Sequence, residues 1–352
     1  MSENRPLVLV GDDAVLEELL RMAAAAGCDL RRVPDATAAR PLWQSAPLIL
    51  LDPAGAREIQ TARLPKRDRV IVVSPDTTTV EGWQAAIDLG AERVIELPAA
   101  GSWLADAFAD AAEGTGPPGR VLAVVGGRGG AGASVFAAAV AKAAARAGHR
   151  AMLVDCDPLA AGLDLVLGAE SEQGLRWPDV EVRGRVAASS LRAALPGAAG
   201  LKLVSGARKG FAPEPDAVTA VIQAGRRGGD IVVCDLPREL SASARAALDL
   251  ADLTVIVVPA ELRACASARL VAGRLKEHGV VAQVLVRGPA PGGLTPDEVA
   301  TAVELPLLSW MPHQRGLAAA LERGRFTDRR GPLLTAARFA LETLGMDEAV
   351  AS

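Results

Sequence analysis

The chain has 352 residues, of which 50% are hydrophobic, 23% charged and 3% aromatic, and its formal net charge is −4 at pH 7. This length and apolar content predict about two globular domains whose cores are mainly aliphatic. The slightly acidic balance excludes a protein that coats nucleic acid over its whole surface, although it leaves a local basic face open. The four cysteines form no Cys-x-x-Cys pair and the three histidines are scattered, so we expect no zinc site.

The N-terminus has neither the basic start nor the long apolar stretch of a signal peptide. No apolar run approaches the roughly 20 residues that a helix needs to cross a bilayer. From these two features we expect a soluble cytoplasmic protein.

Five short apolar runs alternate with helical segments in the first third of the chain, which is the pattern of a parallel α/β domain. The clearest helical segment, VLEELLRMAAAAG, closes on Gly27, as helix C-termini commonly do. We therefore expect a flavodoxin-like domain over residues 1–112. Its expected strands are residues 7–10, 28–33, 47–52, 68–73 and 92–97.

Residues 113–119 (EGTGPPG) are the expected linker, because consecutive prolines flanked by glycines cannot continue a helix. Six apolar runs then alternate with longer helical segments over residues 120–352. Near-continuous Val, Ile and Leu runs suit parallel strands that are covered on both faces, so this region also belongs to the α/β class. Its expected strands are residues 120–125, 151–155, 230–235, 253–259, 281–286 and 305–312.

The stretch VVGGRGGAGASVFAAAVAKAA (124–144) passes from an apolar strand through a glycine-rich turn into a helix. In such turns backbone N–H groups point inward around an anion, and the positive end of the helix adds to the attraction. Phosphate-binding loops also use a lysine for the outer phosphates and a hydroxyl for Mg²⁺. Here Ser134 can supply the hydroxyl, but Ala133 stands where the lysine belongs. The predicted nucleotide-binding residues are Gly127, Arg128, Gly129, Gly130, Ala131, Gly132, Ala133, Ser134 and Val135.

Acidic residues end two later strands. Asp155 and Asp157 lie in LVDCDP, and Asp235 lies in IVVCDLP. Ligands of open α/β sheets bind at the carboxyl ends of the strands, where carboxylates can hold Mg²⁺ directly or through water. We predict a Mg²⁺ site from Ser134, Asp155, Asp157 and Asp235, with Asp157 and Asp235 as candidates for a catalytic role. The alternative for each aspartate alone is a cap on the following helix.

These motifs give residues 120–330 a resemblance to the MinD/ParA superfamily of deviant P-loop ATPases. The family loop KGGxGK[ST] corresponds to RGGAGAS, in which Arg128 replaces the first lysine and Ala133 the second. LVDCDP resembles the DxD segment of the family, and GLDLVLG (162–168) resembles the segment after it in MinD-like members. The resemblance implies ATP and Mg²⁺ as ligands. It also implies a nucleotide-sandwich homodimer in which the residue at position 128 reaches the phosphates of the partner.

Two departures from the family pattern weaken the expected chemistry. A charge-assisted hydrogen bond contributes about 1.5–3 kcal/mol, so the loss at Ala133 predicts binding weaker by roughly ten- to a hundredfold, with hydrolysis affected more. Near VLVRGPAPGG, related proteins often carry an Asn that reads the adenine, whereas this chain has Val286 or Arg287. We therefore expect weak or absent ATP hydrolysis, with ATP and Mg²⁺ bound weakly or lost.

The N-terminal region resembles a response-regulator receiver. Asp52 occupies the phosphoacceptor position, and Asp12 and Asp13 follow the first strand, although Gly11 replaces one member of the usual acidic pair. Leu97 replaces the lysine that would neutralise a phosphoryl group. We expect a pseudo-receiver that serves protein contacts and is not phosphorylated.

A receiver-like domain before a MinD-like domain resembles both the septum site-determining (Ssd) proteins and the CpaE/TadZ proteins, which position pilus-secretion machinery. Our leading interpretation is an Ssd-like regulator of septum placement or cell division that acts as a homodimer through division proteins. The alternatives are a CpaE/TadZ-type localisation factor for pilus or secretion machinery, an active ATPase of the ParA/MinD type, and a protein that binds DNA non-specifically.

The C-terminal segment provides evidence about membrane binding. It ends in Asp347 and Glu348, unlike the basic helix with which MinD reaches the membrane. Recruitment to the septum or a pole is therefore expected to be indirect, through partner proteins.

Overall fold

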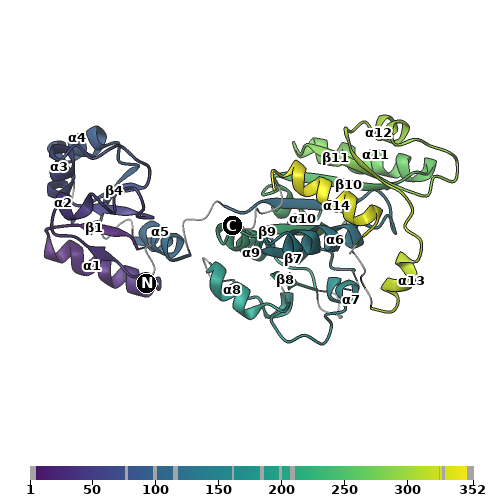
Figure 1. Ribbon diagram of the computed structural model, residues 1–352, viewed down its shortest axis with the longest axis horizontal. Coiled ribbons are helices and arrows are strands. Elements are labelled where there is room, and N and C mark those ends of the chain that lie inside the picture. Colours follow the sequence, from purple (N-terminus) through teal and green to yellow (C-terminus); the bar gives the residue numbers. More distant parts are fainter. Residues whose placement is uncertain are drawn as a thin grey trace. The chain divides into compact units, whose positions relative to one another are not determined.

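The computed structural model describes residues 5–75, 78–97, 101–113, 118–160, 162–182, 186–197, 200–206, 211–324, 326 and 330–346. The chain forms two compact units, Met1–Gly116 and Pro117–Ser352, each built around one parallel sheet (Figure 1). Residues 114–117 of the expected linker, together with Asp347 and Glu348, lie outside the described residues. In the part of the chain that is described, no helix combines the length and the apolar character needed to span a membrane.

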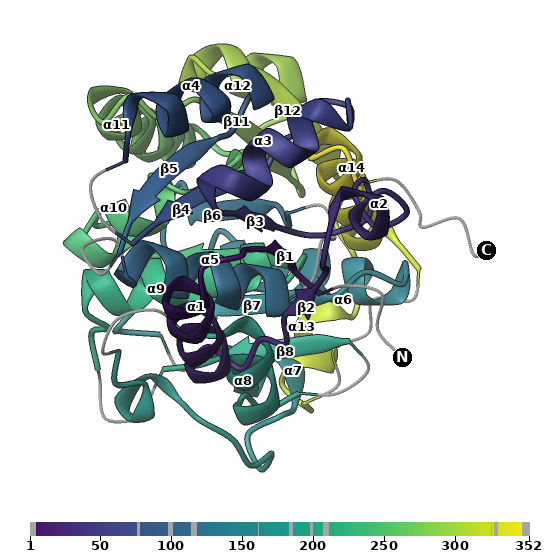
Figure 2. The same cartoon turned by 90° about the vertical axis from the view of Figure 1, so that its left-hand side faces the viewer.

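The N-terminal unit has a five-stranded parallel sheet in the order β2-β1-β3-β4-β5, which is the order of flavodoxin-like folds. Its strands are β1 (Leu7–Leu9), β2 (Arg31–Arg32), β3 (Ile49–Leu51), β4 (Val70–Ser74) and β5 (Arg93–Glu96). Its helices are α1 (Asp13–Ala25), α2 (Ala36–Ala39), α3 (Pro53–Thr61), α4 (Val80–Leu89) and α5 (Gly101–Glu113). Figure 2 shows this sheet between α1 and α5 on one side and α3 and α4 on the other.

Successive side chains of a strand point to opposite faces, and the two cores of this unit follow that alternation. Leu7 and Leu9 pack into the core beneath α2, α3 and α4, whereas Val8 and Val10 pack into the core beneath α1 and α5. Burial on both faces explains why the strands read as continuous apolar runs in the sequence.

The C-terminal unit has a seven-stranded parallel sheet in the order β12-β11-β10-β6-β9-β7-β8. Its strands are β6 (Val121–Gly126), β7 (Ala151–Asp155), β8 (Leu201–Val204), β9 (Ile231–Leu236), β10 (Leu253–Pro259), β11 (Ala282–Arg287) and β12 (Leu307–Met311). The sequence prediction of six strands was wrong here, because it omitted β8. That edge strand is short and contains Lys202, whose ammonium group donates to the carbonyls of Leu195 and Gly197.

Helices cover both faces of this sheet. α6 and the C-terminal helix α14 pack together on one face, and α9, α10, α11 and α12 pack on the other (Figure 1). The helical elements are α6 (Ala133–Arg146), α7 (Leu163–Leu167), η1 (Trp177–Asp179), α8 (Ala188–Ala194), α9 (Pro215–Arg227), α10 (Ala242–Leu248), α11 (Leu262–Glu277), α12 (Pro296–Val303), α13 (Leu317–Leu321) and α14 (Pro332–Thr343). Both units are therefore α/β, as the sequence predicted.

The glycine-rich loop lies at the middle of the carboxyl edge of this sheet. β6 pairs with β10 on one side and with β9 on the other, so the loop that follows Gly126 is flanked by the ends of both neighbours. Asp155 at the end of β7 and Asp235 near the end of β9 are register partners. The fold thus places the predicted loop and carboxylates along one edge, where ligands of open α/β sheets bind.

Candidate functional site

The loop between β6 and α6 has a backbone that requires glycine. Gly130 and Gly132 have φ angles of 69° and 95°, in the left-handed region that L side chains rarely adopt. The N–H group of Gly127 donates to the carbonyl of Val257 at 2.9 Å, which ties the loop to β10. α6 begins after Gly132 without a side-chain cap. The positive end of α6 is therefore open to an anionic ligand.

Two buried carboxylates face the start of α6. Asp155 and Asp235 are each 2% exposed, and they lie on adjacent strands. The pKa of Asp235 is raised to about 8, mainly because the carboxyl group is buried. A hydrogen bond from the Ser134 hydroxyl lowers this pKa, whereas the nearby charge of Asp155 raises it. Burial likewise raises the pKa of Asp155 to about 6, although backbone N–H groups oppose the shift. The structure thus gathers three of the four predicted Mg²⁺-binding residues in one place.

The fourth residue, Asp157, is more exposed than the other two carboxylates. Its backbone N–H group donates to Asp155 Oδ1 at 3.2 Å, and its own Oδ1 accepts from the N–H group of Leu159 at 2.9 Å. Its carboxylate therefore shapes the loop after β7. It also contributes to the raised pKa of Asp235, so it lies within electrostatic range of the site.

These oxygen ligands fit a divalent cation. Two buried carboxylates side by side disfavour ionisation, and a bound cation would reverse that balance. Within the described ranges, no group of three or more His, Cys, Asp or Glu side chains forms a metal site made of protein alone. Mg²⁺ suits such a place, because it usually keeps waters and nucleotide phosphates among its ligands.

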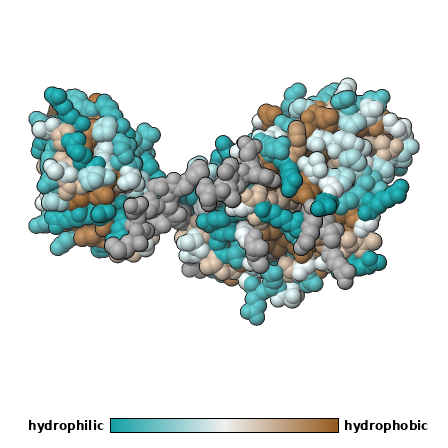
Figure 3. Space-filling model, in the orientation of Figure 1, coloured by the Kyte–Doolittle hydropathy of each residue, from teal (hydrophilic) through white to brown (hydrophobic). Residues whose placement is uncertain are grey.

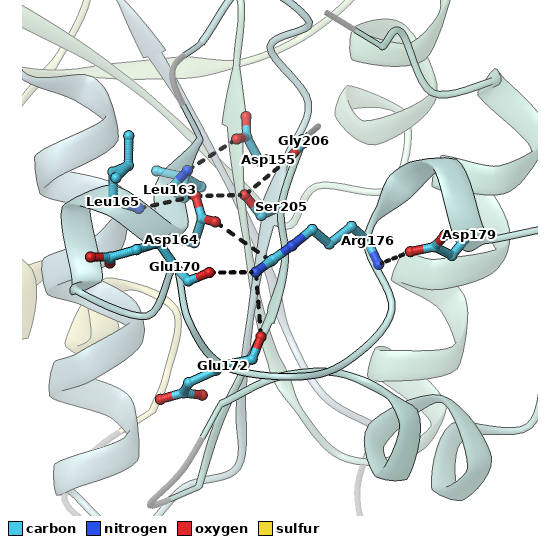
Figure 4. A network of polar contacts seen from close by, with 10 residues as sticks. All are labelled: Asp155, Leu163, Asp164, Leu165, Glu170, Glu172, Arg176, Asp179, Ser205 and Gly206. Atoms are coloured by element: carbon cyan, nitrogen blue, oxygen red, sulfur yellow. Dashed lines mark hydrogen bonds and ion pairs between the residues drawn. The ribbon is translucent and has the colours of Figure 1, made fainter. Parts of the chain in front are cut away.

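A polar network holds the segment that follows Asp155 (Figure 4). Asp155 Oδ2 accepts from the N–H group of Leu163 at 3.2 Å. Asp164, which is 1% exposed, accepts from the Ser205 hydroxyl at 3.2 Å and pairs with Arg176 at 3.5 Å. The Arg176 guanidinium also donates to carbonyls of the loop before it. Sequence reasoning missed this network, although GLDLVLG contains Asp164.

Three guanidinium groups surround the glycine-rich loop. Arg128, at the position of the first family lysine, donates to both carboxylate oxygens of Glu261 at 2.9 and 3.1 Å. Arg238, which follows β9, has Nη2 3.8 Å from the place that a Cβ on Gly129 would take. Arg287 reaches the loop from the end of β11, and its Nη1 lies 3.5 Å from the Gly130 carbonyl oxygen.

Sequence reasoning considered Arg287 only for base recognition and did not consider Arg238. An arginine directly after or at the end of an apolar strand was the available signal, but it does not say which loop the side chain reaches. Ala133, the first residue of α6, places a methyl group where the family has a cation.

The receiver-like residues lie at the carboxyl edge of the N-terminal sheet. Asp52 is 6% exposed, and its Oδ2 accepts from the N–H groups of Gly11 at 2.7 Å and Asp12 at 3.3 Å. Its Oδ1 accepts from the N–H group of Gly55 at 2.6 Å, so Asp52 caps α3. Asp12 caps α1, and Asp13 is exposed at the start of that helix.

The place of the receiver lysine is apolar. Leu97 follows β5 and is 8% exposed. The Asp52 carboxylate is therefore held by backbone N–H groups of its own unit.

Fold and site together define a ParA/MinD-type P-loop domain that follows a CheY-like domain. A ParA family ATPase from Chlorobium tepidum TLS superposes with a TM-score of 0.55 and 18% identity, over 65% of this chain and 99% of that chain. A chain of the MinC:MinD cell division protein complex from Aquifex aeolicus superposes with a TM-score of 0.55 and 21% identity, over 66% of this chain and 98% of that chain. The septum site-determining protein MinD complexed with Mg-ADP from Pyrococcus horikoshii OT3 superposes with a TM-score of 0.50 and 19% identity, over 64% of this chain and 95% of that chain. These likenesses show the fold.

Sequence comparison gives the family. Residues 9–120 match the family described as Rv3660c-like, CheY-like N-terminal domain, and residues 120–281 match the family of the cellulose biosynthesis protein BcsQ. The uncharacterized protein Rv3660c of Mycobacterium tuberculosis (strain ATCC 25618 / H37Rv) is 44% identical over 342 residues, which cover 96% of this chain and 97% of that protein. The chain belongs to the Rv3660c-like family of ParA/MinD-type proteins.

Proposed function

We propose that this protein is a ParA/MinD-type spatial regulator whose C-terminal domain binds a nucleoside polyphosphate with Mg²⁺ and hydrolyses it slowly or not at all. One observation carries the proposal: the carboxyl edge keeps an uncapped helix start and a buried Asp155–Asp235 pair, while Ala133 provides no cation. The first two features fit binding of a charged ligand. The third removes transition-state stabilisation, which hydrolysis needs more than binding does.

The proposed site assigns separate tasks to its residues. Backbone N–H groups between residues 128 and 135 bind the phosphates, as in other phosphate-binding loops, while the N–H group of Gly127 holds the loop to β10. Ser134, Asp155 and Asp235 hold Mg²⁺, directly or through water, and the bound cation neutralises the phosphate oxygens. Asp157 and Asp235 are the candidates for orienting an attacking water molecule. Without the lysine, the loop has no cation at position 133 to stabilise the negative charge that develops on the transferred phosphoryl group.

We place the protein at the division septum, where it would act through dimerisation and through contacts with division proteins. The likeness to a chain of the MinC:MinD cell division protein complex supports this role. Leu159, in the turn after β7, and Leu262, at the start of α11, are 91% and 77% exposed and lie at the edge that holds the site. Apolar side chains at such an edge suit a second copy or a partner protein. The N-terminal domain (residues 1–112), joined by a linker (113–119) to the P-loop domain (120–352), would serve further protein contacts.

Nucleotide binding and turnover test the biochemical part of the proposal. The wild-type protein should bind labelled ATP with Mg²⁺ at weakened affinity and show negligible phosphate release. Ala133→Lys should tighten binding about ten- to a hundredfold and raise turnover above the wild-type background. Ala133→Leu, which adds bulk without charge, is the matched control. Brisk turnover by the wild type would contradict the proposal and favour an active ATPase.

Localisation and assembly test the cellular part. A fluorescent fusion expressed at native level should mark the septum, and Mg²⁺ with ATP should increase the apparent mass of the purified protein in sedimentation. Leu159→Asp should reduce that mass increase, whereas Leu270→Asp, at a side chain on α11 that is 72% exposed, should not. A polar focus beside pilus-secretion components would instead support a CpaE/TadZ-type role.

A further inference from the structure

Arg287 occupies a place that is electrostatically unfavourable for a cation. It is half-buried, and it lies against the glycine-rich loop at the positive end of α6. Its Nη1 is only 2.9 Å from the position that a Cβ on Gly132 would take, so the guanidinium lies directly over the residue before α6. Burial and the neighbouring charge of Arg128 lower the pKa of Arg287, against the opposing effect of Glu261.

A carboxylate of the protein offsets this charge only in part. Glu261 is the acid that lies near both arginines, and Arg128 already binds both of its oxygens. Across the described ranges of the chain, Arg287 forms no ion pair, and its side-chain hydrogen bond goes to the Gly130 carbonyl at the limiting distance of 3.5 Å. One carboxylate thus serves two guanidinium groups beside a helix N-terminus. Such a surplus of positive charge is stabilised when an anion binds.

We propose that Arg287 supplies, from the end of β11, the phosphate-binding cation that the loop lacks at Ala133. The ligand is the polyphosphate of a nucleotide, so this inference rests on the proposed function and names the residue that makes binding effective without the lysine.

The local geometry supports this assignment. Gly132, over which the guanidinium lies, directly precedes Ala133, so the charge reaches the residue next to the vacant lysine position. A side chain at residue 132 would meet Arg287 and would also be strained at φ 95°. Glycine there both shapes the loop and leaves room for the guanidinium. A guanidinium offers a planar set of donors that can bind two phosphate oxygens at once, which suits ground-state binding.

Equilibrium binding with four variants tests the proposal. Fluorescent ATP and inorganic triphosphate, each with Mg²⁺, are titrated into the full-length wild type and into Arg287→Ala, Arg287→Lys, Arg274→Ala and the double variant Arg287→Ala/Ala133→Lys. Arg274 is an exposed arginine on α11 and is the matched control. Circular dichroism verifies that each variant is folded, and Arg287→Lys keeps the test valid if Arg287→Ala does not fold.

Arg287→Ala should weaken both ligands about ten- to a hundredfold. Arg287→Lys should lose less, Arg274→Ala should match the wild type, and the double variant should regain most of the lost affinity. Equal binding by the wild type and a folded Arg287→Ala protein would overturn the role of Arg287 while leaving the proposed function intact. A wild type that binds neither ligand would instead overturn the proposed function, and the assignment of Arg287 with it.

Discussion

The two units each place a buried aspartate at the carboxyl edge of a parallel sheet, but they use it in opposite ways. Asp52 in the N-terminal unit accepts three hydrogen bonds from backbone N–H groups and caps α3. Asp235 in the C-terminal unit is just as buried, yet it faces a second carboxylate, and its pKa is raised to about 8. The fold alone therefore does not decide whether such an edge binds a ligand.

Surface hydropathy does not account for this contrast. The face shown in Figure 3 mixes hydrophilic and hydrophobic residues on both units. What separates the two edges is the local charge. The N-terminal edge has Leu97 where receivers carry a cation, and the C-terminal edge has Arg128, Arg238 and Arg287 around its loop. Titratable groups whose pKa is shifted by burial, together with unbalanced charge, are typical of sites that bind or react.

Asp235→Asn should stabilise the metal-free protein, by an amount that grows with pH. The folded pKa near 8 exceeds the ordinary value of 3.8, so the folded state keeps a proton that the unfolded chain has released. The contribution of this group to stability is complete below about pH 4 and is lost as the pH rises toward 8. One pKa unit corresponds to about 1.4 kcal/mol, so the gain at pH 8 is on the order of a few kcal/mol.

Urea unfolding in the presence of a chelator, followed through exchange protection of the β9 amides at pH 4.5 and pH 8, measures this gain. Asp249→Asn, at an exposed carboxylate after α10, is the control and should change stability little at either pH. Equal stability of the wild type and Asp235→Asn at pH 8 would show that the carboxylate pair carries no electrostatic cost.

Asp52→Ala should destabilise the protein, which is the opposite of the effect expected for Asp235→Asn. It leaves the N–H groups of Gly11, Asp12 and the buried Gly55 without their acceptor, which costs about 1–3 kcal/mol. The same urea experiment, followed through the β1 and β3 amides, gives the loss. Asp13→Ala, at the exposed start of α1, should cost less than about 1 kcal/mol. If Asp52→Ala left the N-terminal unit as stable as before, the carboxylate would not be acting as a structural cap.

Restoring the receiver lysine at position 97 should have the smallest effect of these substitutions, because it should not allow phosphorylation of Asp52. After incubation with Mg²⁺ and a small phosphodonor, both the wild type and Leu97→Lys should remain unmodified at Asp52, because backbone N–H groups already occupy both carboxylate oxygens. Mass spectrometry of the intact protein and its peptides provides the readout, with Asp52→Asn as the blank. A stable aspartyl-phosphate on wild-type Asp52 would refute the pseudo-receiver assignment.

Local patterns made much of the fold predictable from the sequence. Strands buried on both faces read as apolar runs, and the turn between β6 and α6 is indicated by glycines that need positive φ angles. Gly27, with φ 66°, follows α1 close to where the pattern placed its end. The edge strand β8 was missed because four residues with Lys202 in the middle give too weak a signal.

The remaining features depend on contacts between distant parts of the chain. Local sequence patterns do not determine the order of parallel strands in a sheet. The sequence therefore could not show that β11 lies two strands from β6 and brings Arg287 to the loop. The position of Asp52 was predictable. Its role as a cap depends on how closely the backbone of Gly11 and Gly55 approaches it.

Hydrogen exchange on the full-length protein, with and without saturating Mg²⁺ and ATP, can compare both edges in one sample. Backbone N–H groups of residues 127–136 and 155–160 should exchange more slowly with ligand, while those of residues 11–15 and 52–56 should not change. Unchanged exchange at residues 127–136, or an equal slowing at both edges, would contradict the view that only the C-terminal edge is built to hold a polyphosphate.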